Sequence, residues 1–428
     1  MKKVITITIT MFLLALAFSS SRAFSFSGGN GTESDPYQIA NIDDLQELND
    51  SVIFGSGTSW SINKYFILTQ DITDIVTFHI GGNRNFAGHL NGNRHKITIE
   101  MYAAQGLFAN TDRSAIIENL IVDGIISVSE PYVLGLGAIV GNNHGTIRNC
   151  INYASVFGGV GYCGGISGYN FSIIENCINY GSIESPFTHV GGIAAIFIGT
   201  NMDGRIDRCI NVGNVKTGNL YWGVGGIVGM VSNSTPSGVK FTISNCINIG
   251  NIGNPEATNN GIGGIIGYIG FLDTLLISNC INAGYIQSNG GQQVGGILGN
   301  TMMMAYTAPY ILISNCINTG VVEGNINVGA ISGLIGSTLQ LTITNCHYDK
   351  QFCIHKGVNG ADVSGVSGHL TRNMVGRKLA SLLGDNDWTY TEGATLIQSL
   401  YPQLKTLDHT DASKVGATPI FLYDGLKD

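Results

Sequence analysis

The sequence predicts an all-β protein, a right-handed parallel β-helix of about nine coils with three strands each and short helical caps. Two short motifs alternate along the chain, and the apolar runs between Gly or Asn residues are only three to five residues long, without helical periodicity. In addition, 60 of the 428 residues are Gly, about twice the usual share. Right-handed winding follows from the general preference of parallel crossovers.

The first motif is a Gly pair followed by Ile, a variable residue and Gly, as in Gly225 to Gly229. The second is Ile-x-Asn-Cys-Ile-Asn, as in Ile243 to Asn248, and a short Gly-x-Val or Gly-x-Ile piece follows it. The spacing of the motifs varies while the motifs themselves are retained, which places insertions in turns, as in a solenoid. The motif cysteine recurs at Cys150, Cys177, Cys209, Cys246, Cys280, Cys316 and Cys346.

Residues 1–23 are expected to form a signal peptide. Lys2 and Lys3 supply the positive start, Val4 to Phe18 the apolar stretch, and small residues precede a cleavage point after Ala23. No later apolar run is long enough to span a bilayer, so no transmembrane segment is expected in the mature chain. These features predict a protein that is secreted or held at the cell surface.

The mature chain divides into an N-terminal entrance and cap (24–60), parallel β-helix repeats (61–350) and a C-terminal cap and tail (351–428). A short helix is expected from Ile42 to Leu48, with Asn41 as its N-cap. A second is expected from Arg372 to Leu383, with Thr371 as its N-cap. Both would cover ends of the solenoid, which otherwise expose the core.

The seven motif cysteines are expected to form a structural ladder inside the rod. Strict strand alternation would put Cys150 on the opposite face from Ile147, but a left-handed residue at Asn149 would turn the thiol inward. Stacked neighbours lie about 4.8 Å apart with parallel Cβ vectors, which suits free thiols better than disulfides. Cys163 and Cys353 lie off the ladder and are the better candidates for bonding or reactivity. The repeated Asn residues are expected to hydrogen-bond between coils.

The repeat unit, Gly-Gly-Ile-x-Gly followed by Ile-x-Asn-Cys-Ile-Asn-x-Gly-x-Val, resembles the GLUG-motif repeat. The opening from Gly31 to Ile39, the Trp388-Thr389-Tyr390 segment and the Tyr401-Pro402-Gln403-Leu404 segment resemble the usual borders of such modules. The resemblance implies a bacterial surface β-helix like the non-catalytic repeat region of IgA-protease metallopeptidases. The zinc-binding His-Glu-x-x-His motif of the peptidase is not in this sequence.

Charge is scarce and unevenly distributed. Charged residues are 12% of the chain, and between Cys209 and Asn345 they are confined to Lys216, Lys240, Glu256, Asp273 and Glu323. The net charge of −8 argues against a nucleic-acid partner. The sequence singles out no catalytic, metal-binding or ligand-binding residue and predicts no cofactor. His79, His89 and His95 could approach one another, but without the carboxylate spacing of a metal site.

The function predicted from these features is that of an exported, non-catalytic surface protein, acting as a stalk, adhesin or binding module. Its partner would be an extracellular glycan or a host or cell-surface protein, and Tyr162, Tyr169 and Tyr180 could stack on sugars. The alternative is a polysaccharide lyase or hydrolase on the same scaffold. Clustering of the acidic residues of the N-terminal coils on one face would favour it, namely Asp71, Asp74, Glu118 and Asp123.

Overall fold

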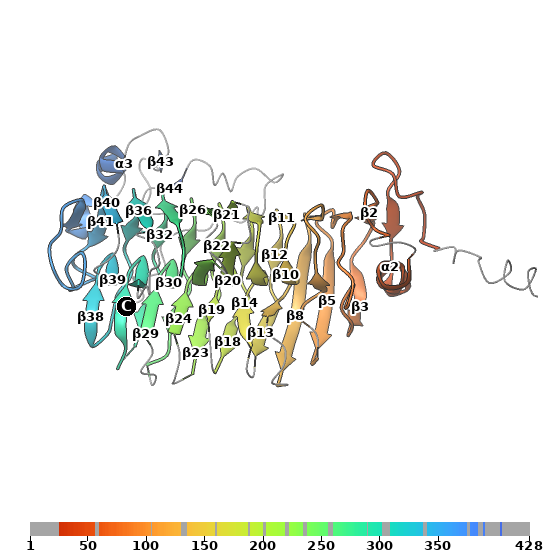
Figure 1. The fold of residues 1–428 in the computed structure, drawn as a ribbon, viewed down its shortest axis with the longest axis horizontal. Helices are drawn as coiled ribbons and strands as arrows, with labels where there is room; N and C mark the ends of the chain where they lie inside the picture. Colours follow the sequence, from red (N-terminus) through yellow and green to blue (C-terminus); the bar gives the residue numbers. More distant parts are fainter. Residues whose placement is uncertain are drawn as a thin grey trace, which may run out of the picture.

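The chain forms a parallel β-helix, as predicted, in which successive coils stack along one axis (Figure 1). The computed structural model describes residues 25–55, 60–103, 105–129, 135–158, 161–186, 189–199, 203–218, 222–233, 238–255, 260–288, 290–301, 309–336, 340–374, 377–383, 388–389 and 403–404. The expected signal peptide lies outside these residues. The right-handed winding stays a prediction.

Four parallel sheets, numbered in chain order, run along the rod. Sheet 1 has eleven strands: β1 (Tyr37–Ile39), β2 (Tyr65–Leu68), β4 (His89–Asn91), β7 (Ile116–Glu118), β11 (Thr146–Arg148), β16 (Ile173–Glu175), β21 (Gly204–Asp207), β26 (Lys240–Ser244), β31 (Thr274–Ser278), β36 (Tyr310–Ser314) and β40 (Gln340–Thr344). Sheet 2 has sixteen: β3 (Ile72–Val76), β5 (Lys96–Met101), β8 (Ile121–Val128), β12 (Ile151–Asn152), β13 (Ser155–Gly158), β17 (Ile178–Asn179), β18 (Ile183–Ser185), β22 (Ile210–Asn211), β23 (Val215–Thr217), β27 (Ile247–Asn248), β28 (Ile252–Gly253), β32 (Ile281–Asn282), β33 (Ile286–Gln287), β37 (Ile317–Asn318), β41 (Cys346–Asp349) and β42 (Val366–His369).

Sheets 3 and 4 complete each coil. Sheet 3 has seven strands: β9 (Gly135–Gly137), β14 (Tyr162–Gly164), β19 (Val190–Gly191), β24 (Trp222–Gly225), β29 (Asn260–Gly263), β34 (Gln292–Gly295) and β38 (Ile326–Gly329). Sheet 4 has eight: β6 (Phe108–Asn110), β10 (Val140–Asn143), β15 (Ser167–Asn170), β20 (Ala194–Gly199), β25 (Val228–Asn233), β30 (Ile266–Ile269), β35 (Leu298–Thr301) and β39 (Ser332–Ile335).

The three β-prone pieces expected in each repeat are subdivided into five short strands, as in β16 to β20. The left-handed residue inside Ile-x-Asn-Cys-Ile-Asn separates a sheet 1 strand from a sheet 2 strand, and the Gly pair separates a sheet 3 strand from a sheet 4 strand. The structure therefore keeps the predicted repeat but bends the chain at two additional places per coil.

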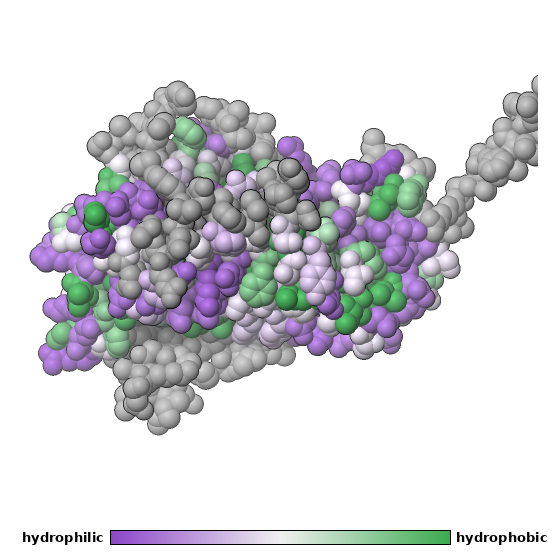
Figure 2. Space-filling view, turned by 90° about the horizontal axis from the view of Figure 1, so that it is seen from below, coloured by the Kyte–Doolittle hydropathy of each residue, from purple (hydrophilic) through white to green (hydrophobic). Residues whose placement is uncertain are grey.

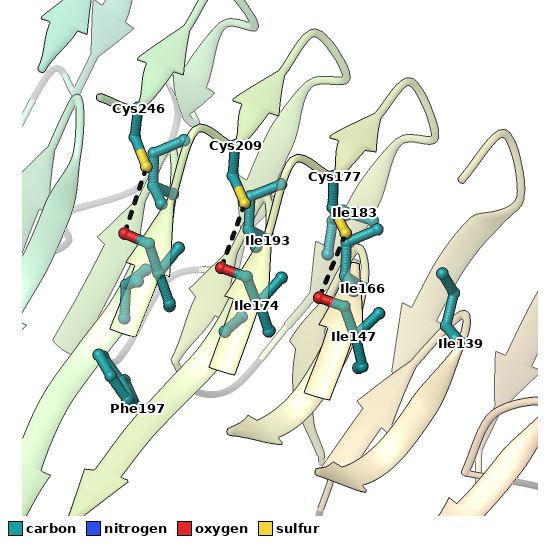
Figure 3. Packing of buried hydrophobic residues seen from close by; sticks show 14 of the residues in the cluster. Ile139, Ile147, Ile166, Ile174, Cys177, Ile183, Ile193, Phe197, Cys209 and Cys246 are labelled. Carbon is teal, nitrogen blue, oxygen red and sulfur yellow. Dashed lines mark hydrogen bonds between the residues drawn. The ribbon is translucent and has the colours of Figure 1, made fainter. Parts of the chain in front are cut away.

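The left-handed conformation predicted at Asn149 is present, with φ of 55°. It recurs before every ladder cysteine, including at Arg208 (φ 51°), which stands where the other repeats have Asn. Each of the seven thiols is fully buried. Cys177 Sγ lies 3.9 Å from the Ile147 carbonyl oxygen and Cys209 Sγ lies 3.7 Å from that of Ile174, so each thiol donates to the preceding coil (Figure 3).

A second ladder of buried amides runs beside the cysteines. Asn211 Nδ2 donates to Asn248 Oδ1 at 2.8 Å, and Asn248 Nδ2 donates to Asn282 Oδ1 at 2.8 Å. The same bond links every step from the Asn152 side chain to that of Asn318, and all six side chains are fully buried. Each amide also donates to a carbonyl in its own coil, as Asn248 does to Gly250 at 3.0 Å.

The glycines of the first motif allow two close approaches. A Cβ at Gly226 would lie 2.4 Å from Asn248 Cγ and 2.1 Å from the Gly264 carbonyl oxygen, so the second Gly of the pair makes room for the amide ladder. A Cβ at Gly267, the last Gly of the motif, would lie 2.3 Å from the Val224 nitrogen. Sheets 3 and 4 therefore meet backbone to backbone at this bend.

Because Cys and Asn both point inward, the Ile between them points outward. This outer isoleucine row consists of Ile178, Ile210, Ile247, Ile281 and Ile317, which are at most 2% exposed. The row packs in one apolar cluster with Met374, Leu379, Ala380 and Leu383. These belong to a C-terminal cover, made of η1 (Thr371–Asn373), Met374 and α3 (Arg377–Leu383), which lies over the last coils (Figure 1).

The expected single helix from Arg372 to Leu383 is thus divided. Thr371 begins a 3-10 turn instead of capping an α-helix, and the turn places Met374 fully inside the outer cluster. Farther along, β43 (Trp388–Thr389) pairs antiparallel with β44 (Gln403–Leu404). The rest of the two border segments that resemble repeat modules lies outside the described residues.

At the other end, α2 (Ile42–Phe54) begins where the sequence predicts and continues six residues beyond Leu48. The Asn41 side chain accepts from the Asp44 nitrogen at 3.0 Å, as expected of an N-cap. The buried Asp44 carboxylate accepts from the Ser27 nitrogen and hydroxyl and from the Ala40 nitrogen, at 2.7 to 2.8 Å. It thereby fastens the start of the described chain to the helix.

Replacing Asn248 by Ala should lower the free energy of unfolding by about 2–4 kcal/mol, because Asn211 Nδ2 loses its acceptor and Asn282 Oδ1 loses its donor in the buried ladder. Urea unfolding followed by circular dichroism measures the change. Asn251→Ala, at an exposed position three residues on, is the matched control and should change stability by less than about 0.5 kcal/mol. Equal effects of the two substitutions would contradict a stabilising amide ladder.

The thiols provide a second test. All nine cysteines are free and buried, so a chromogenic thiol reagent should detect almost none in the native protein. After denaturation without reductant it should detect all nine, including the seven of the ladder. Two or fewer reactive thiols in the denatured protein would mean that the ladder is oxidised to disulfides.

Candidate functional site

Several charged side chains of the rod line the outer face of sheet 1. The central residue of each strand, such as Ile117 or Ile147, points into the core, so the residues on either side of it point outward. Because the strands are in register, outward residues of successive coils come together. We name the resulting surface the polar track, which consists of His89, Glu118, Arg148, Glu175, Arg205, Asp207 and Arg208.

Glu118 is held between two donors from neighbouring coils. Its Oε1 lies 2.7 Å from His89 Nε2, and its Oε2 accepts from Arg148 Nε at 2.6 Å. The hydrogen bond with His89, together with the bond and charge of Arg148, lowers the pKa of Glu118 below its ordinary value despite partial burial. The carboxylate therefore stays ionised, and both of its oxygens already have a hydrogen-bond partner.

The next carboxylates along the track are paired in the same way. Glu175 Oε2 accepts from Arg205 Nη2 at 2.5 Å. Asp207, only 4% exposed, lies 3.0 Å from Arg208 Nη1 and accepts from the Ser244 hydroxyl at 2.7 Å. Each acidic group of the track thus meets a basic or hydroxyl group, and the surface presents hydrogen-bonding groups with little net charge.

Arg208 also replaces the amide of the repeat. Its Nε donates to Asn176 Oδ1 at 2.6 Å, as Asn279 Nδ2 donates to Asn245 Oδ1 at 3.2 Å two coils later. A guanidinium at this position therefore preserves the link between coils and adds a positive charge to the track.

The acidic residues of the N-terminal coils do not share one face. Glu118 belongs to β7 of sheet 1, whereas Asp74 and Asp123 belong to β3 and β8 of sheet 2. Asp123 Oδ2 lies 3.3 Å from Lys96 Nζ, and Asp71 Oδ1 accepts from the Lys96 nitrogen at 3.0 Å. Glu118, Asp71 and Asp123 thus each contact basic or backbone groups.

The three histidines are likewise kept apart. His89 contacts Glu118, and His95 Nδ1 lies 3.1 Å from Asp71 Oδ1. His79 is half-buried, and burial lowers its pKa. Among the described residues, no group of three or more His, Cys, Asp or Glu side chains is arranged to hold a metal ion.

The aromatic candidates stack on each other. The Tyr153 and Tyr180 rings are parallel within 9°, with centroids 4.9 Å apart, and Tyr162 stacks on His189 at 5.5 Å and packs edge-on against Tyr169. Rings that stack along the rod cover each other's faces and expose their edges, which is a poor platform for a sugar ring. Tyr221 and Met302-Met303-Met304 lie outside the described residues, as does the Trp222 side chain.

Apolar side chains are also exposed away from the polar track. In the face seen in Figure 2, hydrophobic residues gather toward the end that carries α2. Ile75 of β3 and Tyr102, just after β5, are 51% and 60% exposed. Single exposed residues of this kind are common on soluble proteins and do not by themselves mark a site.

The cysteines do not form a reactive site. Burial raises the pKa of Cys177, Cys246 and Cys316 of the ladder. The expectation that Cys163 and Cys353 are bonded or reactive is wrong, because both are free thiols buried in the main core cluster. Burial raises the pKa of Cys163 to about 12 and that of Cys353 to about 11.

The structure brings together one pair that the sequence reasoning missed. His347 Nδ1 lies 3.0 Å from His369 Nε2, at the last coil of sheet 2. Aligning Cys346-His347-Tyr348 with the Cys-Ile-Asn of the other repeats would have placed His347 in the outer isoleucine row. The sequence offers no corresponding signal for His369, which lies outside the repeats.

No family model matches the chain, so the GLUG resemblance stays a prediction. Halomucin of Haloquadratum walsbyi is 28% identical over 153 residues, which are 30% of this chain and 2% of that protein. A putative Gly-rich membrane protein of Evansella cellulosilytica is 32% identical over 137 residues, 28% of this chain and 15% of that protein. This chain therefore matches only a small part of either relative.

Among solved structures, a putative immunoglobulin A1 protease from Bacteroides ovatus aligns with 89% of this chain and 95% of its own, with a TM-score of 0.43 and 18% identity. Within the part of the chain that the structure describes, no helix has the length and apolar character needed to cross a membrane.

Proposed function

We propose that this protein is an exported β-helix protein of a bacterial cell surface that acts as a non-catalytic binding module, with the polar track as its contact surface. The observation that carries the proposal is the pairing of Glu118 and Glu175 with Arg148 and Arg205 of the following coils, and of Asp207 with the adjacent Arg208. Such a surface offers regularly spaced donors and acceptors without a strong net charge. It suits a neutral polar partner such as an extracellular glycan or the polar surface of a host protein.

The rod shape supports a role in presenting this surface. Eleven stacked strands in sheet 1, at about 4.8 Å each, give a sheet about 50 Å long. The track occupies consecutive coils of that sheet, so a linear partner could contact several coils at once. Export is supported by the basic start and apolar stretch of residues 1–23.

The alternative of a polysaccharide lyase or hydrolase has less support. Two cooperating carboxyl groups would be needed on one face, one of them with a raised pKa as the general acid. The pKa values of Glu118 and Asp71 are instead lowered. Carboxylates that share a sheet with another acidic residue, such as Asp123 in sheet 2 and Glu175 in sheet 1, are paired with Lys96 and Arg205. The observed pairs resemble surface ion pairs that fasten one coil to the next.

Binding can be tested with an array of neutral and anionic glycans and host matrix proteins. The double variant Arg148→Ala, Arg205→Ala should bind the probes recognised by the wild type at least about 10-fold more weakly, because the track loses two donors. Lys216→Ala, at an exposed cation of sheet 2, is the matched control and should bind normally. Unchanged binding by a folded double variant would reject the track, and cleavage of any array glycan would reject the non-catalytic role.

The charge state of Glu118 gives a second test. Since its pKa is lowered in the folded protein, its stabilising effect is present above its ordinary pKa and is lost as the pH falls through the folded value. Glu118→Gln should therefore lower the unfolding free energy by about 1–2 kcal/mol at pH 7 and have little effect near pH 3. Urea unfolding at both pH values measures this, with the exposed Glu184→Gln as control. A difference that grows on acidification would contradict it.

A further inference from the structure

In the last coil, the position of the outer isoleucine row is taken by a histidine. His347 occupies the position that Ile317 holds one coil earlier, and it is only 5% exposed. Its hydrogen-bond partner His369 ends β42, and the C-terminal cover begins two residues later at Thr371. The pair therefore lies at the junction between the rod and the segment that covers its outer apolar row.

We propose that the His347–His369 pair is an acid-operated latch: protonation of the rings releases the C-terminal cover and exposes the outer isoleucine row. This inference does not depend on what the polar track binds. It adds a conformational change to a face that the proposed function does not use.

The hydrogen-bond network determines which ring nitrogens carry protons when the latch is closed. Asn345 Nδ2 donates to Asn315 Oδ1 at 2.9 Å, so Asn345 Oδ1 is the acceptor facing His347 Nε2 at 3.1 Å. His347 must then carry its proton on Nε2 and accept at Nδ1 from His369 Nε2–H. Both rings are neutral in this arrangement, and each polar contact is satisfied.

Acid destroys this arrangement. A proton added to His347 Nδ1 sets two N–H donors face to face at 3.0 Å, unless His369 moves its own proton to the other nitrogen. A second proton, on His369, rules out this change of tautomer and leaves two positively charged rings in contact. The charge on His347 lies at the end of an apolar row and is only 5% exposed, so hydrating it requires the chain around it to move.

Among the described residues, no carboxylate is seen to offset the burial of His347. Burial, followed by the charge of His369, lowers the pKa of His347 to about 4. Burial also lowers the pKa of His369, where Lys350 acts in the same direction and Asp349 opposes them. In the cover, Arg372 and Lys378 are both basic, and Lys378 Nζ lies 3.5 Å from Asn373 Oδ1.

The direction of the pH effect follows from these shifts. In the open form His347 regains an ordinary pKa near 6.5, so that form binds more protons than the closed form between about pH 6.5 and pH 4. The contribution of His347 to the stability of the closed form is therefore fully present above pH 6.5 and is lost as the pH falls toward 4. From pH 7 to pH 4.5, opening should increase on the order of 10- to 100-fold.

Hydrogen–deuterium exchange of the full chain at pH 7 and pH 4.5, with labelling times scaled to equal intrinsic exchange, tests the latch. Peptides covering residues 366–383 should lose protection by about that factor at pH 4.5, while peptides covering the central coils, 240–320, keep theirs. Unchanged protection of 366–383 in the wild type would overturn the proposal. Loss of protection in the cover and the central coils together would also overturn it, since it would show acid unfolding of the whole rod.

Two variants connect the response to the pair. His347→Ile places the residue of the other rungs at this position and should keep the cover protected at pH 4.5. His144→Gln changes another half-buried histidine, which stacks on Phe171 far from the cover, and should respond like the wild type. If His347→Ile does not fold, His369→Gln removes the second positive charge and should weaken the response. A wild-type response in the folded variants at 347 or 369 would reject the latch.

Discussion

One backbone conformation, repeated in every coil, determines the rest of this structure. The residue before each ladder cysteine is left-handed, at φ near 53°, and it interrupts the alternation of the strand. Without it, Cys177 and Asn179 would point outward and Ile178 inward. With it, thiols and amides fill the core, a row of isoleucines remains outside, and a C-terminal segment covers that row. The inner ladders and the outer cover have the same cause.

Much of the fold could be predicted from local patterns. The repeat, the turn at Asn149 and the N-cap Asn41 each depend on a few adjacent residues, and the structure has all three. The division into five strands could not be predicted because the sequence does not show that the chain changes sheet at the Gly pair. The break in the C-terminal helix could not be predicted because it depends on the packing of Met374 against the outer isoleucine row. That row exists only because Ile317 and its equivalents point outward.

The polar track was harder to predict because its contacts cross coils. Glu118 and Arg148 are 30 residues apart, and His89 is 29 residues before Glu118. Their contact requires the exact register of β4, β7 and β11, which insertions of variable length obscure in the sequence. Glu118 and Asp123 are only five residues apart in the sequence, yet the turn between β7 and β8 places them in sheets 1 and 2.

The buried amide ladder also has a direction. Each Nδ2 from Asn152 to Asn282 donates toward the following coil, and each Oδ1 from Asn179 to Asn318 accepts from the preceding one. The aligned amide dipoles add along the axis, with the positive end toward the last coil. The ladder thiols and the amides of Asn279 and Asn345 donate the other way, toward the preceding coil, so their dipoles oppose those of the buried amide ladder. The links between coils thus run in both directions along the axis, and each coil is held to its neighbour by donors from both sides.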